Sequence, residues 1–271
     1  MAVVAKLLGI TTDLHFVFIC WGLIFTRITV MLLLTPFLGS QAVPSRGRIA
    51  VAMALSIFMY PLIVPPLQGT LPDDNGILLA LFFKEAFFGL AISLVTVMVF
   101  YALEAAGRVV DHQKGGGAGE LFVPQLGQVS ETGLFNFWLA MAFFISIGGH
   151  RLFLKAFLES FQTVPLLQLP HLDSGLSPFL KLFIGLSGNV LVTAVQIAAP
   201  VVIAAFLVDV VLGIANKMAP QINVFELGFA IRGYVAPLIL YIALLTIVNQ
   251  MDSVLKGMIQ SVYEISHIFS Q

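Results

Sequence analysis

The residues best suited by type and spacing to proton chemistry are Glu104, Asp111 and His112, which lie in one short stretch near the middle of the chain. Carboxylates beside an imidazole can relay protons because histidine titrates near neutral pH. The alternative is a solvated helix end, on which Glu104 and Arg108 form an i, i+4 ion pair worth only about 0.2–0.5 kcal/mol. We favour this alternative, because exposed ion pairs are weak evidence of function.

Other catalytic and metal-binding patterns are absent from the sequence. It contains no HExxH, GxSxG or GxxxxGK[ST] motif, and its glycine cluster does not match GxGxxG. The single cysteine, Cys20, excludes an internal disulfide and a multi-cysteine metal or redox site. His150 follows two glycines, where we expect a cap at a helix break rather than a ligand. The sequence therefore predicts no enzyme, metal site or cofactor.

Four charged residues lie within or at the edges of long apolar segments: Arg27, Lys84, Glu85 and Asp209. Such residues are functional candidates, because a charge in a membrane is costly without a partner. The structural alternative, which we favour slightly, is an inter-helix or inter-subunit ion pair that fixes assembly. Adjacent helical residues point about 100° apart, so Lys84 and Glu85 are expected to meet different partners rather than each other.

A glycine-rich stretch divides the chain. Residues 104–133 change from charged to glycine-rich to polar, with Gly115, Gly116, Gly117, Ala118 and Gly119 at the centre. Glycine adopts backbone angles closed to other residues and lets another backbone approach closely. Irregular backbone at membrane depth is tolerated where it is buried in protein or lines a cavity. We expect this segment to obstruct or line a passage.

The composition indicates an integral membrane protein. Hydrophobic residues make up 59% of the 271, charged residues 10%, and the mean hydropathy is +1.01, whereas about 25% charged residues is usual in soluble domains. A net charge of -1 without a basic cluster argues against a nucleic-acid partner. The N-terminus lacks the features of a signal peptide, so the first helix is expected to remain in the mature protein.

The apolar runs predict an all-α protein, with Pro61, Pro65 and Pro66 stopping the second helix, Asp209 ending the longest uncharged run, and a turn over 213–225. The proline-rich connector at 165–178 is the best internal boundary. The loops mix both signs of charge, as Lys217 with Glu226 illustrates, so the topology signal is weak and partner subunits are expected to help hold the helices. The predicted helices cover residues 14–38, 49–64, 77–106, 134–147, 152–161, 182–208 and 233–251, with a weaker amphipathic helix over 252–271.

Several segments resemble the FliR/SctT family of type III secretion export-apparatus proteins. The similarity runs in order over nearly the whole chain, and its most specific element is LGIANKMAPQINVF. The segments are LLLTPFLGSQAVPSRGRIAVAMALSIFMYP at 32–61, FFKEAFFGLAISL at 82–94, AAGRVVDHQKG at 105–115, GGH at 148–150, SFQTVP at 160–165 and DVVLGIANKMAPQINVFELGF at 209–229.

The resemblance implies a single-copy subunit of a helical export gate for unfolded proteins. Its implied partners are FliP/SctR-like and FliQ/SctS-like subunits and an FlhB/SctU-like switch protein. Its implied place is the bacterial inner membrane, within the basal body, with much of the gate above the membrane plane. The implied fold is a FliP-like region, 1–170, followed by a FliQ-like helical hairpin and amphipathic tail, 171–271.

In this family the loop after the long third helix supplies a plug inside the channel, which by position is residues 107–133 here. Many relatives have one glycine followed by bulkier residues where this chain has GGGAG. Arg27, Lys84, Glu85, Glu104, Arg108, Asp111, Asp209 and Lys217 are the candidate assembly or gate charges. Asp209 resembles an acidic position common in SctT-type members, which favours an injectisome slightly over a flagellum.

Two other functional classes compete with the export gate. A self-contained small-molecule or ion transporter would use Glu104, Asp111 and broken helices at its midplane. It should show paired interruptions in the two halves of the chain, and the sequence shows none. An intramembrane enzyme would need a nucleophile or metal constellation, which the sequence also lacks.

Overall fold

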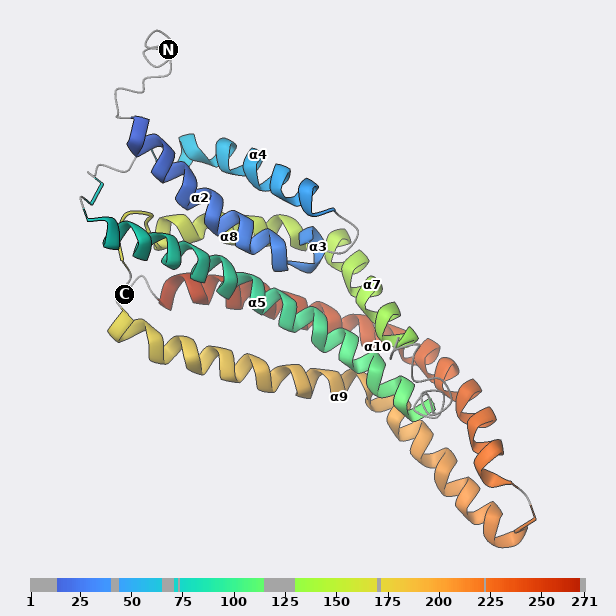
Figure 1. Cartoon of the computed structure of the whole chain (residues 1–271). Helices are drawn as coiled ribbons and strands as arrows, with labels where there is room; N and C mark the ends of the chain where they lie inside the picture. The colour runs from blue at the N-terminus through green and yellow to red at the C-terminus, as the bar shows by residue number, and fades with distance from the viewer. Residues whose placement is uncertain are drawn as a thin grey trace. The chain divides into compact units, whose positions relative to one another are not determined.

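The computed structural model describes residues 14–39, 44–64, 71–72, 74–114, 130–169, 172–221 and 223–268. Every regular element in these ranges is a helix (Figure 1), which confirms the all-α fold. The helices are α2 Leu14–Leu34, α3 Pro36–Gly39, α4 Ser45–Ile63, α5 Asn75–Lys114, α7 Glu131–Ser146, α8 Gly149–Thr163, α9 Leu172–Met218 and α10 Val224–Ile268.

Five of the described helices are long and apolar enough to cross a membrane, namely α2, α4, α5, α9 and α10. A sixth span is possible by the same measure if α7 and α8 together make one broken span. Between these two, Gly148 has φ of +74°, a backbone angle that side-chain-bearing residues rarely adopt. The predicted helix break at this position is confirmed.

Several predicted helix ends are wrong, because the helices continue past the residues expected to stop them. The second helix, however, ends within one residue of the predicted Val64, because α4 ends at Ile63. Pro61 does not stop it, since Val64 N–H still donates to the Tyr60 carbonyl at 3.0 Å. Asp209 lies inside α9, which continues to Met218, so the turn shortens to a few residues before α10. The amphipathic tail is the last part of α10 and not a separate helix.

The connector between α8 and α9 is also shorter than predicted. Helix α9 begins at Leu172, so Pro178, which the sequence suggested as the end of a proline-rich connector, is helical. A proline costs a helix one backbone hydrogen bond. This loss is small beside the many other backbone hydrogen bonds of α9, which has 47 residues. The division into 1–170 and 171–271 is a comparison with FliP and FliQ, and it stays a prediction.

The chain divides into two compact units, and each draws on separated segments. Unit 1 comprises Met1–Val97, Phe153–Leu180 and Ser261–Gln271. Its core contains apolar side chains of α2, α5 and α8 with no exposed surface, among them Leu23, Phe88 and Phe153. Helix α2 also packs against α4.

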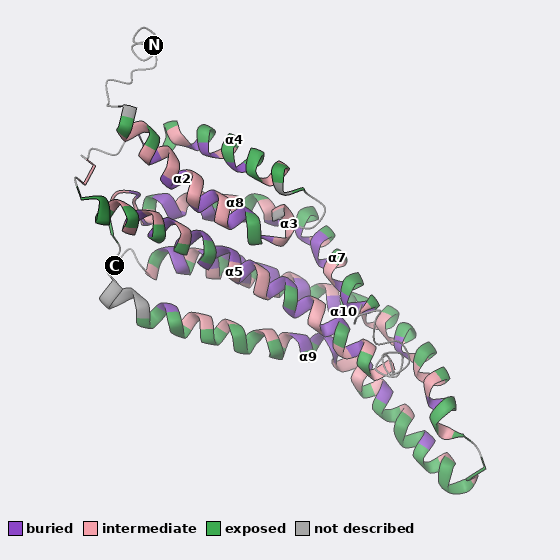
Figure 2. Cartoon of the chain, viewed as in Figure 1, coloured by how far each residue is buried: buried purple, intermediate pink, exposed green. Residues whose placement is uncertain are grey.

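Unit 2 comprises Met98–Leu152 and Lys181–Gln260. In its first part, the Phe100 ring on α5 lies 5.8 Å from the ring of Phe144 on α7, edge to face. In its second part, Ala198 of α9 and Ala236 of α10 are buried together with Val110 of α5. Figure 2 shows that α5 is the most buried long helix, whereas α4, α9 and α10 carry much exposed surface.

Candidate functional site: a buried ion cluster and a polar helix junction

Arg27, on α2, is fully buried and has all of its nitrogens occupied. Its Nε donates to a carboxylate oxygen of Glu85, on α5. Its Nη1 donates to the Ser160 carbonyl at 3.0 Å and to the Ser160 hydroxyl at 3.1 Å, and its Nη2 donates to the Val164 carbonyl at 3.1 Å. The guanidinium also lies 4.1 Å from the centre of the Phe161 ring. The pair that Arg27 makes with Glu85 joins two helices of the chain, as the slightly favoured structural alternative expects.

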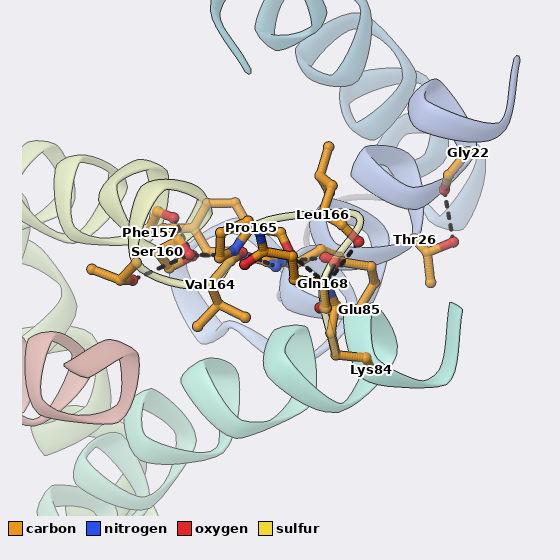
Figure 3. Close-up of polar contacts among 12 residues, drawn as sticks. Gly22, Thr26, Lys84, Glu85, Phe157, Ser160, Val164, Pro165, Leu166 and Gln168 are labelled. Carbon is orange, nitrogen blue, oxygen red and sulfur yellow. Dashed lines mark hydrogen bonds and ion pairs between the residues drawn. The ribbon is translucent and has the colours of Figure 1, made fainter. Parts of the chain in front are cut away.

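Lys84, on α5, points its ammonium into the backbone that follows α8 (Figure 3). Nζ donates to the carbonyls of Pro165 at 2.7 Å, Leu166 at 2.8 Å and Gln168 at 3.1 Å. It also lies 2.8 Å from Glu85 Oε1 and forms an ion pair with it. Because an ammonium has three N–H donors, the three carbonyls already use all of them.

The expectation for Lys84 and Glu85 is therefore partly wrong. Glu85 does meet a different helix, since its carboxylate pairs with Arg27. However, the same carboxylate also contacts Lys84, because the long lysine side chain reaches the neighbouring position although the two residues point about 100° apart on the helix. These contacts form an inter-helix ion cluster within one chain.

The cluster holds two cations and one carboxylate, and backbone carbonyls balance the remaining positive charge. The last carbonyls of a helix lack internal partners and carry the negative end of its dipole. Ser160 and Val164 lie at the end of α8, and their carbonyls accept from Arg27. Arg27 thus caps the C-terminus of α8, and Lys84 binds carbonyls of the segment that follows it, which explains how two cations can be buried beside a single carboxylate.

A second polar cluster joins the end of α5 to the start of α7, in unit 2. Asp111 Oδ2 accepts from the Ser130 hydroxyl at 2.6 Å and from the Thr132 amide at 2.9 Å. Its Oδ1 accepts from the Thr132 hydroxyl and from Lys114 Nζ at 2.9 Å. Ser130 is the N-cap of α7 and accepts from the Gly133 amide at 2.9 Å. Asp111 therefore fixes the residue that starts the next described helix.

Two glycines bring α5 and α7 into close backbone contact at this junction. A Cβ on Gly107 would clash with the backbone of Thr132 and Gly133. A Cβ on Gly133 would lie 3.0 Å from the Glu104 carbonyl oxygen and 2.6 Å from the Ser130 hydroxyl. Glycine is needed here because the approach leaves no space for a side chain.

The predicted proton relay is not assembled. Glu104 pairs with Arg108 at 2.6 Å, and the arginine side chain is 56% exposed. Asp111 forms its hydrogen bonds with Ser130, Thr132 and Lys114 instead. His112 is exposed and takes no part in these bonds. Glu104 and Arg108 form the exposed ion pair that we favoured, whereas Asp111 is half-buried at the junction with α7.

The remaining predicted residues lie apart from both clusters. Asp209 Oδ1 lies 3.6 Å from Arg232 Nη1 within the α9–α10 pair, and Lys217 is exposed in the last turn of α9. His150 Nδ1 is buried and makes no hydrogen bond with the described residues, so the structure gives no evidence for the expected cap. The predicted plug residues, Gly115, Gly116, Gly117, Ala118 and Gly119, lie outside the described residues.

The described ranges contain no group of three histidine, cysteine, aspartate or glutamate side chains that could hold a metal ion. The two clusters can stabilise buried charged side chains and fix the backbone at the end of α8 and at the start of α7. Four of the described side chains that form hydrogen bonds in these clusters were not among the predicted site residues: Lys114, Ser130, Thr132 and Ser160. Ser130 could have been found as an N-cap, because a serine directly precedes an apolar helical run. Arg232 was also missed, although it lies in an apolar segment just as Arg27 does.

Known proteins resemble this chain over nearly its whole length. A family model described as bacterial export proteins, family 1, matches residues 18–258. The chain is 34% identical over 213 residues to the flagellar biosynthetic protein FliR of Bacillus subtilis strain 168, covering 78% of this chain and 80% of that protein. It is 30% identical over 224 residues to Yop proteins translocation protein T of Yersinia pestis, covering 82% and 84%.

A third relative extends the match. The surface presentation of antigens protein SpaR of Shigella flexneri is 27% identical over 241 residues, covering 87% of this chain and 89% of that protein. The relatives thus include flagellar proteins and proteins named for translocation or antigen presentation, and the family model spans far more than half of the chain. Together with its apolar, membrane-type helices, these matches establish that the chain belongs to the FliR/SctT family of bacterial export proteins.

Proposed function

We propose that this chain is the single-copy subunit of a type III secretion export gate, in which it forms and plugs the channel for unfolded proteins. The observation that carries the proposal is the family match over residues 18–258, with relatives named for flagellar biosynthesis and for Yop translocation. The membrane-type helices support a place in the bacterial inner membrane. A position largely at periplasmic level is part of the same proposal.

The exposed apolar helices support partner subunits. In the most apolar 18-residue stretch of each helix, 11% is buried within the chain for α10 and 28% for α9, against 61% for α5. Apolar faces of this extent must be covered by lipid or by other proteins. We assign them to lipid together with FliP/SctR-like and FliQ/SctS-like subunits, and we include an FlhB/SctU-like switch protein among the contacts. The proposed FliQ-like hairpin is α9 with α10.

The sequence placed the plug loop at 107–133, but residues 107–114 are helical in α5 and 131–133 are helical in α7. We therefore assign the plug to the part of the chain between these helices, and the polar junction at its edges supports the assignment. Asp111 and Lys114, at the end of α5, bond to Ser130 and Thr132, at the start of α7. A plug needs fixed attachment points if the intervening chain is to return to the same place. The glycines at 115–119 would let that chain fill a narrow passage without bulky side chains.

We propose no catalysis by this chain. Glu104 is engaged in an ion pair with Arg108 and Asp111 in the junction between α5 and α7, and nothing in their geometry favours the transporter that would use them. Relatives from both kinds of secretion system match, so the lean towards an injectisome, drawn from Asp209, stays a prediction.

The test is purification of the tagged chain from its native operon in mild detergent, followed by native mass spectrometry. We expect a large complex containing one copy of this chain and several copies each of two smaller hydrophobic proteins. Recovery as a lone monomer or homodimer would refute the gate proposal and favour the transporter.

A further inference from the structure

The segment between α8 and α9, residues 164–169, is bound to the rest of unit 1 mainly through its own carbonyl oxygens, and we call it the strap. Val164 gives its carbonyl to Arg27, and Pro165, Leu166 and Gln168 give theirs to Lys84. Four of its carbonyls therefore end on two cations, which come from two other helices (Figure 3). Neutral side chains at 27 and 84 would leave these acceptors without their partners.

The two cations do not have equivalent roles. Arg27 divides its donors between Glu85, the end of α8 and the first carbonyl of the strap. Lys84 directs all three of its hydrogen bonds to the strap, at 2.7–3.1 Å, and its side chain is 3% exposed. Three donors at one point match three converging carbonyls, an arrangement that a planar guanidinium cannot reproduce.

The same part of α5 also contacts the start of α9. The Phe87 ring, one turn along α5 from Lys84, lies 5.1 Å from the Phe179 ring of α9. The chain is thus tied to α5 before and after the point where α9 begins. Of these two ties, the one at Lys84 is ionic and can be removed by a single neutral substitution.

We propose that Lys84 is the closing element of an ionic latch, which holds the strap against α5 and so fixes where α9 begins. In this latch, the Arg27–Glu85 ion pair joins α2 to α5, and the ammonium of Lys84, held on α5 by its side chain, binds the carbonyls of the strap. The strap opens when that cation is removed. This inference concerns the chain's own conformation and does not depend on the export function.

Leu166 offers a direct reporter of the latch, because it belongs to the strap and its side chain is fully buried. The chain has one native cysteine, Cys20, which is buried, so a Cys20→Ala, Leu166→Cys chain carries a unique thiol. The full chain is purified with whatever proteins accompany it, and the rate of maleimide labelling is measured. Two variants are compared with this parent: Lys84→Met, which keeps the length without the charge, and the control Lys155→Met. Lys155 is 67% exposed and pairs only loosely with Glu159, at 3.7 Å.

We expect Lys84→Met to raise the labelling rate at least about tenfold, because several hydrogen bonds to a charged group are lost together. Lys155→Met should leave the rate unchanged. In Lys84→Ala, ammonium or methylammonium ions should restore protection, whereas tetramethylammonium at equal ionic strength should not, because it has no N–H donor. Lys84→Arg keeps the charge and should fold even if Lys84→Met does not, and it should label at an intermediate rate.

Three results would overturn the latch. One is labelling of Lys84→Met no faster than that of Lys155→Met, and another is full protection in Lys84→Arg, which would show that three converging donors are not needed. The third is equal rescue of Lys84→Ala by tetramethylammonium. Mass spectrometry of the same preparations reports the subunit composition, so a failed latch and a failed gate assignment are distinguished.

Discussion

Glu85→Gln should destabilise the chain itself, before any effect on its assembly or transport. The Glu85 carboxylate is fully buried and is in contact with the two cations Arg27 and Lys84. Glutamine has nearly the same shape, so the change removes the negative charge and leaves both cations buried without an anion. Breaking a buried ion pair by removing one partner costs about 3–5 kcal/mol. Such a loss is a large part of the roughly 5–15 kcal/mol that holds a typical domain folded.

The matched control is Glu104→Gln, on the same helix. Glu104 pairs with Arg108, whose side chain is 56% exposed, and an exposed i, i+4 pair contributes about 0.2–0.5 kcal/mol. The structure therefore predicts a difference of several kcal/mol between two chemically identical substitutions on α5.

The assay is the yield of monodisperse protein in mild detergent and the apparent Tm from thermal unfolding monitored by size-exclusion chromatography. Glu85→Gln should lower both strongly, whereas Glu104→Gln should stay close to the parent. The double variant Arg27→Gln, Glu85→Gln should lose less stability than the sum of the two single losses, because the two residues interact directly. Equal behaviour of Glu85→Gln and Glu104→Gln, or additive losses in the double variant, would refute the assignment of a buried intrachain ion cluster.

Two further predictions concern unit 2. Gly107→Ala should lower the apparent Tm, because the added Cβ would clash with the backbone of Gly133, whereas Gly213→Ala, which has open space around it, should not; equal Tm values would contradict the close helix contact. Deletion of residues 115–119 should leave the complex assembled but make the membrane leaky to ions, measured as conductance or dye uptake in cells; intact tightness with normal assembly would count against the plug.

The membrane class and the positions of the buried charges could be predicted from sequence, because both depend on local composition. A charge within an apolar run must find a partner, and Arg27, Lys84 and Glu85 all do. The identity of the partner could not be predicted. Arg27 and Glu85 are 58 residues apart, and the acceptors of Lys84 are backbone carbonyls, which every residue possesses and no motif marks.

Helix ends were less predictable, because sequence signals for stopping a helix compete with tertiary packing. Pro61 was one of three prolines expected to stop the second helix, yet it lies inside α4. Helix α9 continues through Asp209 and into the predicted turn, as far as Met218. A proline removes one hydrogen bond, and a single carboxylate can reach a partner such as Arg232 on the neighbouring helix. The free energy lost at one proline, or in placing one paired carboxylate in a helix, is small beside the free energy that tertiary packing gives a long apolar helix. The break at Gly148 was predictable because it depends on a local backbone angle.

The two polar clusters bear on how this chain joins other subunits. Lys84 and Glu85 were candidates for inter-subunit pairing, but their hydrogen bonds and ion pairs lie within the chain. Asp111 is likewise satisfied by the neighbouring helix start. Among the described helices, the largest exposed apolar surface is on α9 and α10. We therefore expect apolar helix faces to drive assembly, with the buried charges setting the shape of the surface that those faces present. Substitutions in the ion cluster would then impair assembly only through loss of the chain's own fold.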